Sequence, residues 1–322
     1  MLDIKIKKLI QLYQSKQYDA AEKLAKSLTK KFPKHPFAWK VLGALLGQAG
    51  RTSEASNAFQ NLVTLTPQDT EAHYNLGLSL KELGRLDEAE KSFKQAILLN
   101  PNYANAYNNL GITVKKLGRL GDAEKCYRQA ILLNPNSIEA YSNLGNTLKE
   151  SDRLEEAEAN YRQAILLNFN YSKAHNGLGG TLQGLGRLEE AEASLSQAIT
   201  LDPNYAEAYR LLSIFKKFNS QDEQYLKMQE LYLDENITEE QRCHINFGLA
   251  KVFEDLGNFK QAFIHYSEGN KLRKKLLNYD IDQDMELFKQ IKCNYRHIKQ
   301  NTLKPNKLEN IPAAHTQFSI TN

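Results

Sequence analysis

The sequence contains few cysteines and no long apolar run. Its three cysteines, Cys126, Cys243 and Cys293, lie far apart in 322 residues and form no CxxC pair. A disulfide framework or a zinc site is therefore not expected, and we predict a reducing compartment, the cytoplasm. No stretch approaches the roughly 20 apolar residues that span a membrane. The lysine-rich N-terminus also lacks the apolar run of a signal peptide.

A strong charge imbalance and catalytic motifs are also missing. The 42 basic residues nearly balance the 38 acidic ones, and the net charge of +4 does not point to nucleic acid. The sequence has no HExxH or GxSxG motif and no paired-carboxylate cluster. His73 and His175 occupy a position where other repeats place a large packing residue, so we expect them to pack. We therefore expect no catalytic site, no cofactor and no metal.

One glycine-rich stretch, residues 177–186, resembles a phosphate-binding loop in its letters. A phosphate-binding loop joins a strand to a helix, and no strand pattern precedes this stretch. Two of its glycines belong to a repeat that runs through the chain. The additional ones, Gly177, Gly180 and Gly184, are expected to weaken the helix that contains them.

Prolines are few, with eight in the chain, but their spacing is regular. They return every 34 residues at Pro33, Pro67, Pro101, Pro135 and Pro203, with Phe169 at the one missing step. Two further residue types keep this period: Gly43, Gly77, Gly111, Gly145 and Gly179, and Ala55, Ala89, Ala123, Ala157 and Ala191. This period predicts an all-α fold, a right-handed superhelical solenoid of helix-turn-helix repeats.

The repeat at residues 70–103 shows how one unit is built. Gly84 ends its first helix, because glycine readily adopts the left-handed conformation at a helix C-terminus. Pro101 ends the second helix, since proline cannot continue the hydrogen-bond ladder. Gly77 allows the two helices to approach closely, and Phe93 fills the space beside it. A larger side chain at Gly77 should therefore be costly.

These residues closely resemble the tetratricopeptide repeat (TPR). The resemblance divides the chain into an array over 1–276, a helix or linker over 277–299 and an irregular tail over 300–322. The array comprises repeats at about 2–35, 36–69, 70–103, 104–137, 138–171 and 172–205, a degenerate unit at 206–237, and a last repeat at 243–276. Before that last repeat, Thr238 and Gln241 form a plausible capping box at a helix start.

Polar side chains recur once per repeat on the first helices, which should line the concave side of the array. The candidate partner-binding residues are Asn75, Asn109 and Asn143, Lys81, Lys115 and Lys149, and the neighbouring Asn108 and Asn146. Asparagine offers donors and an acceptor to a peptide backbone, and the lysine row favours acidic peptides. The alternative is that these asparagines are surface residues inherited through tandem duplication.

The asparagine row is similar to that in the repeat half of O-GlcNAc transferases. There, such residues hold substrate peptides, so the resemblance implies the same use for Asn75, Asn109 and Asn143. The chain departs from that pattern at Gly177, which shortens the row.

The run over 266–292 resembles the segment that follows the repeats in bacterial TPR–sulfotransferase proteins. Those proteins continue into a strand and a phosphate loop, whereas this chain continues into a polar stretch without such a loop. We therefore expect a scaffold that binds proteins or extended peptides, but neither nucleic acid nor membranes. The rival is the substrate-presenting part of a truncated or split transferase, with an apolar patch near Phe288 and Ile291. A purely structural scaffold is the third alternative.

Overall fold

The computed structural model describes residues 2–220, 222–280, 285, 289 and 292. These residues form sixteen α-helices and no strand, which confirms the expected all-α fold. The helices are, in chain order, α1 (Leu2–Gln14), α2 (Tyr18–Lys31), α3 (Pro36–Gln48), α4 (Thr52–Leu65), α5 (Thr70–Glu82), α6 (Leu86–Leu99), α7 (Ala104–Lys116), α8 (Leu120–Leu133), α9 (Ile138–Glu150), α10 (Leu154–Leu167), α11 (Ser172–Gly184), α12 (Leu188–Leu201), α13 (Ala206–Phe215), α14 (Glu223–Leu233), α15 (Glu239–Asp255) and α16 (Phe259–Leu276).

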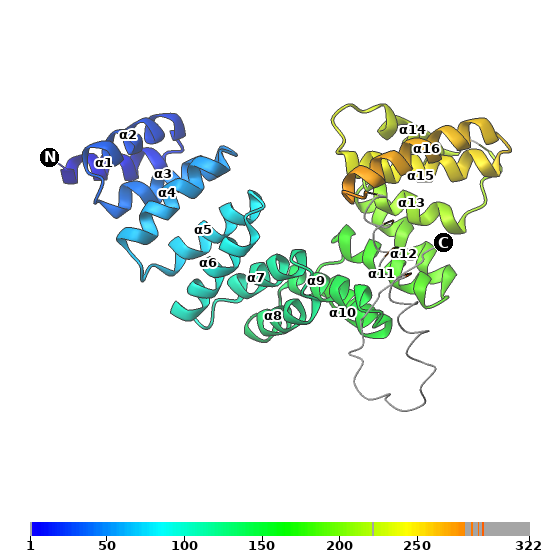
Figure 1. Cartoon of the computed structure of the whole chain (residues 1–322), viewed down its shortest axis with the longest axis horizontal. Helices are drawn as coiled ribbons and strands as arrows, with labels where there is room; N and C mark the ends of the chain where they lie inside the picture. Colours follow the sequence, from blue (N-terminus) through cyan, green and yellow to red (C-terminus); the bar gives the residue numbers. More distant parts are fainter. Residues whose placement is uncertain (1, 221, 281–284, 286–288, 290–291, 293–322) are drawn as a thin grey trace.

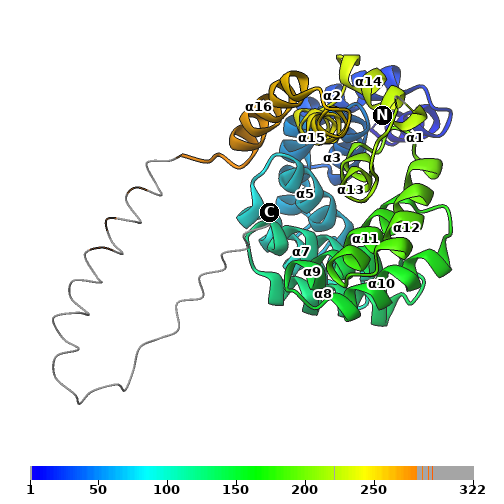
Figure 2. The same cartoon turned by 90° about the vertical axis from the view of Figure 1, so that its right-hand side faces the viewer.

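Consecutive helices pack in pairs, and the pairs stack into a curved array (Figure 1). Each first helix also contacts the first helix of the next pair, as α5 does with α7 and α9 with α11. The first helices therefore line the inner side of the curve, and second helices such as α8, α10 and α12 lie outside (Figure 2).

Glycine and a large side chain fix the packing within each pair. A Cβ atom on Gly77 would lie 2.7 Å from Cε1 of the buried Phe93, and one on Gly111 would lie 2.6 Å from Cε1 of Tyr127. Non-bonded carbon atoms prefer about 3.5–4.0 Å, so these positions have no room for a side chain. Gly84 adopts a φ of 74°, as expected for a residue that ends the first helix.

The fourth residue of several repeats holds the preceding turn. The expected packing residues His73 and His175 do this with Nε2, which lies 3.0 Å and 2.9 Å from the carbonyl oxygen six residues earlier. Trp39 and Tyr209 make the equivalent bond as donors, at 2.7 Å and 3.2 Å. These side chains therefore connect each first helix to the turn before it.

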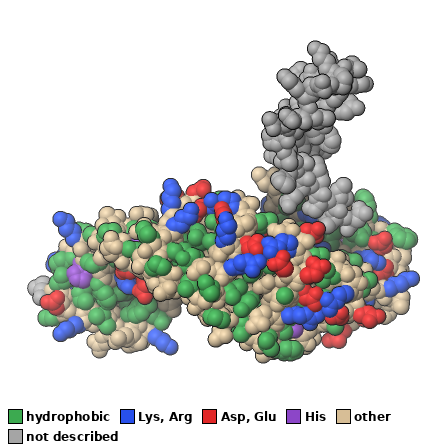
Figure 3. Space-filling model, turned by 90° about the horizontal axis from the view of Figure 1, so that it is seen from below, with side chains coloured by type: hydrophobic (Ala, Val, Ile, Leu, Met, Phe, Trp, Pro, Cys, Tyr) green, Lys and Arg blue, Asp and Glu red, His purple; other side chains and the backbone are tan. Residues whose placement is uncertain are grey.

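An ionic ladder joins successive repeats on the outer helices. An arginine at the start of a second helix pairs with a glutamate 29 residues earlier, in the preceding repeat. The pairs are Arg51–Glu22, Arg119–Glu90, Arg153–Glu124 and Arg187–Glu158, at 2.5–2.8 Å. The face seen in Figure 3 accordingly shows acidic and basic side chains beside one another.

The regular array changes after α12. The short helix α13 packs mainly against α15 and contacts α14 over a smaller area. Helix α15 starts with the expected capping box, in which Thr238 Oγ1 accepts from the Gln241 backbone and Gln241 Oε1 accepts from the Thr238 backbone. Most of the expected helix or linker over 277–299 and the whole tail over 300–322 lie outside the described residues.

Candidate functional site

The sequence-predicted binding residues lie on the inner helices α5, α7 and α9. All eight are partly buried, so each presents only part of its surface to solvent. Their side chains also contact one another between repeats, which the repeat pattern alone did not indicate.

Lys81 and Asn109 form one such contact. The Lys81 ammonium donates to Asn109 Oδ1 at 2.6 Å, and Asn109 Nδ2 donates to Tyr74 Oη at 3.1 Å and to the Asn105 carbonyl at 3.0 Å. Burial lowers the pKa of Lys81, and the charge of Lys116 lowers it further. The Asn109 amide is therefore largely occupied by bonds within the protein.

The next pair of repeats uses its asparagines in the same way. Asn143 Nδ2 donates to Asn108 Oδ1 at 3.0 Å, which leaves Asn143 Oδ1 and Asn108 Nδ2 without printed partners among the described residues. Asn146 Oδ1 accepts from the buried Tyr161 hydroxyl at 2.6 Å. Each of these three side chains thus retains one polar group for a ligand.

The lysine row is not uniform. The Lys115 ammonium pairs with Glu150 at 2.7 Å. Lys149 forms neither a hydrogen bond nor an ion pair with any described residue, and neither does the side chain of Asn75. Burial lowers the pKa of Lys149, although the nearby Glu207 carboxylate opposes this effect.

A second polar column lies beside these residues and was not singled out from the sequence. Its members are 34 residues apart: Lys40, Tyr74, Asn108, Ser142, Asn176, Arg210 and His244. Three of them bond to the following repeat: Lys40 to Glu71 at 2.6 Å, Asn176 to Glu207 at 3.0 Å and Arg210 to His244 at 3.0 Å. The period of 34 was the signal that could have identified this column.

The C-terminal end of this column is buried and positively charged. Burial lowers the pKa of Arg210 and of His244, and the Arg210 charge lowers the pKa of His244 further. Arg210 Nε donates to His244 Nδ1, so the imidazole is neutral in this arrangement. Asn176 is only 4% exposed, and its Oδ1 is buried without a hydrogen-bond partner.

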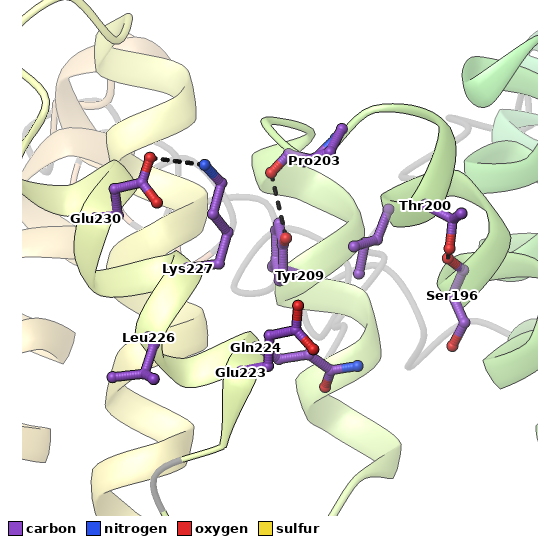
Figure 4. A pocket seen from close by; sticks show the side chains of 10 residues that line it. Ser196, Thr200, Pro203, Tyr209, Glu223, Gln224, Leu226, Lys227 and Glu230 are labelled. Atoms are coloured by element: carbon purple, nitrogen blue, oxygen red, sulfur yellow. Dashed lines mark hydrogen bonds and ion pairs between the residues drawn. The ribbon is translucent and has the colours of Figure 1, made fainter.

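A crevice of about 580 Å³ lies outside these columns, between α12, α13 and α14 (Figure 4). Its wall includes Lys227, which pairs with Glu230 at 2.7 Å, and Tyr209, whose hydroxyl donates to the Pro203 carbonyl. These groups are already paired. The crevice lies where the short α13 and the weakly packed α14 interrupt the regular stacking, so irregular packing accounts for it.

Other kinds of site were sought over the same part of the chain. Among the described residues, no group of three or more His, Cys, Asp or Glu side chains is placed to hold a metal ion. Nor does any helix in the described ranges combine the length and apolar character that crossing a bilayer requires.

The helix pairing and the repeat residues can now be compared with known proteins. Residues 11–241 match the sequence model of the family described as the cilia and flagella-associated protein 70 C-terminal domain, a TPR domain. The chain belongs to this TPR family. No curated protein matches the chain in sequence.

Two solved structures share the TPR fold of the chain. PilW, described as a widely conserved type IV pilus biogenesis factor, is 21% identical with a TM-score of 0.56; the match covers 66% of this chain and 98% of PilW. The APC/C hetero-tetramer Cut9–Hcn1 gives 18% identity and a TM-score of 0.55, covering 84% of this chain and 49% of that one. At these identities the likeness concerns the fold.

Proposed function

We propose that this TPR chain is a non-catalytic adaptor that binds extended segments of partner proteins on its inner surface. The observation that carries the proposal is the set of polar groups on α5, α7 and α9 that remain unbonded while their equivalents are paired. They include the Asn75 side chain, Asn143 Oδ1 and the Lys149 ammonium. A partly buried polar group gains stability when a ligand supplies its missing partner.

The spacing of these groups suits an extended ligand. Packed helices lie about 8–10 Å apart, and an extended peptide advances about 3.3 Å per residue. One polar group therefore meets roughly every third peptide residue. Each neutral hydrogen bond contributes only about 0.5–1.5 kcal/mol net, whereas micromolar affinity needs about 8 kcal/mol. The amides alone give weak binding, so the proposal includes a contribution from the lysines, which favours acidic segments.

The test starts from peptides selected by the protein itself. A displayed library of random peptides of about 12 residues, which span roughly 40 Å when extended, is selected on the wild-type chain. The selected peptides are then measured by calorimetry against a variant that combines Asn75→Ala and Asn108→Asp. The aspartate keeps the oxygen that accepts from Asn143 but removes the unbonded amide group.

The control is Asn160→Ala on the outer helix α10, where the amide bonds only to its own helix at Glu156. We expect the inner variant to bind the peptides at least fivefold more weakly and the control to bind them as the wild type does. Equal affinity of all three proteins would contradict binding through these amides.

A second candidate, the substrate-presenting part of a split transferase, is favoured by one observation. Helix α16 exposes large apolar side chains, including Phe259 at 70% and Phe263 at 72%. Phe288 and Ile291, where the sequence placed such a patch, lie outside the described residues. A docking surface on α16 predicts self-association that Phe263→Ser removes and Leu98→Ser, on α6 and 73% exposed, does not. Light scattering that shows a wild-type monomer would count against it.

A further inference from the structure

The unpaired Lys149 can be explained by comparing the three lysines of the row. Lys81 bonds to Asn109, which lies 28 residues later, and Lys115 pairs with Glu150, which lies 35 residues later. The residues at these two offsets from Lys149 are Gly177 and Gly184. Neither glycine has a side chain, so both intramolecular partners of the row are missing at this one lysine.

A third glycine keeps the space beside the ammonium open. A Cβ atom on Gly180 would lie 3.5 Å from Lys149 Nζ and 3.6 Å from Leu211 Cδ1. Helix α11 runs without a break through all three glycines, from Ser172 to Gly184. Its glycine face therefore adjoins the Lys149 ammonium without supplying a partner for it.

The acids near Lys149 already have other partners. Glu150 pairs with Lys115, and Glu207 accepts a hydrogen bond from Asn176 Nδ2 at 3.0 Å. Asn176 lies one helical turn before Gly180, and its buried Oδ1 has no partner. The region thus contains an unpaired cation and an unpaired acceptor, which match a carboxylate and an N–H group of a peptide.

We propose that the space between Lys149 and the glycine face of α11 is a subsite for a carboxylate of the bound peptide. The protein itself shows the chemistry that fits, since the Glu150 carboxylate occupies the equivalent place at Lys115. The carboxylate comes from an aspartate or glutamate side chain or from a peptide C-terminus. This inference rests on the proposed binding of peptides along the inner surface.

The experiment uses three synthetic peptides of the same Gly-Ser sequence. The first carries one central aspartate between blocked termini, the second carries asparagine there, and the third has no acidic side chain but a free C-terminal carboxylate. Binding is followed in the lysine ¹H–¹³C spectrum of the full chain, where Lys149→Met identifies the Cε signal of Lys149. We expect the aspartate peptide to shift that signal with at least tenfold higher affinity than the asparagine peptide.

Two variants test the geometry. Gly184→Glu places a carboxylate at the offset that Glu150 has from Lys115, so it should raise the pKa of Lys149 and abolish the preference for aspartate. A Cβ at this position meets only the Leu154 side chain, at 2.9 Å, and thermal melts establish that the variant is folded. Lys116→Met, at an exposed lysine of α7, is the matched control and should keep the preference.

The outcomes separate this inference from the proposed function. Equal binding of the aspartate and asparagine peptides, unchanged by Lys149→Met, would overturn the subsite and retain an inner peptide surface. Binding of the third peptide alone at Lys149 would support the subsite and assign it to a chain terminus. If none of the three peptides shifts any inner-surface signal while the selected peptides still bind, the subsite is refuted. If the selected peptides also fail, the proposed function fails with it.

Discussion

The glycine in the middle of each first helix gives the most direct test of the packing. In Gly111→Ala, the new Cβ would lie 2.6 Å from Tyr127 Cε1 and 2.9 Å from two further ring carbons. Tyr127 is only 1% exposed, so its ring has little room to move. Overpacking of this kind costs about 1–3 kcal/mol, whereas replacing glycine by alanine in a helix gains about 0.5–1 kcal/mol. We therefore expect a net loss of about 1 kcal/mol.

Gly121→Ala on α8 is the matched control, because a Cβ there meets no atom within 4 Å. This variant should gain up to about 0.5 kcal/mol from helix propensity alone. Urea unfolding followed by circular dichroism should show the two midpoints moving in opposite directions. A Gly111→Ala midpoint at or above that of Gly121→Ala would refute the steric argument.

Three further predictions follow from other contacts. Ser56 occupies the place of the missing glutamate opposite Arg85 in the ionic ladder, so Ser56→Glu should raise stability by about 0.5 kcal/mol, a gain that disappears in an Arg85→Gln background when both are compared by urea unfolding. Burial lowers the pKa of His265 below its ordinary 6.5, so its contribution to stability is complete above about pH 6.5 and is lost as the pH falls through the lower folded pKa. The difference in melting temperature between the wild type and His265→Gln should therefore change between pH 7.5 and pH 5, and a constant difference would contradict this. Thr238→Ala removes a capping-box bond and should cost about 1 kcal/mol, whereas Thr238→Ser should restore most of it in the same melts.

The helix-turn-helix packing could be predicted from the sequence because it depends on residue size and backbone freedom. Gly84 and Pro101 mark helix ends through their own conformational limits. Gly77 and Phe93 fit together because one has no side chain and the other is large. These properties belong to the residues themselves, so the period of 34 was sufficient to locate them.

The polar contacts of the inner surface could be predicted only in part. The row of Asn75, Asn109 and Asn143 was visible as a repeat, but a row does not show which partner each amide takes. Asn109 bonds to a lysine 28 residues earlier, whereas Asn143 bonds to an asparagine 35 residues earlier. That choice depends on differences of a few ångströms between neighbouring helices, which the spacing does not specify.

The same polar groups serve two competing purposes in this array. Where the repeat is regular, as at Lys81 and Asn109, they bond between repeats and help to fix the stacking, which leaves less for a ligand. Where glycines replace the usual partners, as on α11, the bond between repeats is lost and Lys149 becomes available. A regular array thus has most of its polar groups satisfied internally, and ligand specificity should arise where the repeat fails. For this chain, that argument directs the search for a partner to the stretch from α9 to α13, more than to the regular repeats that precede it.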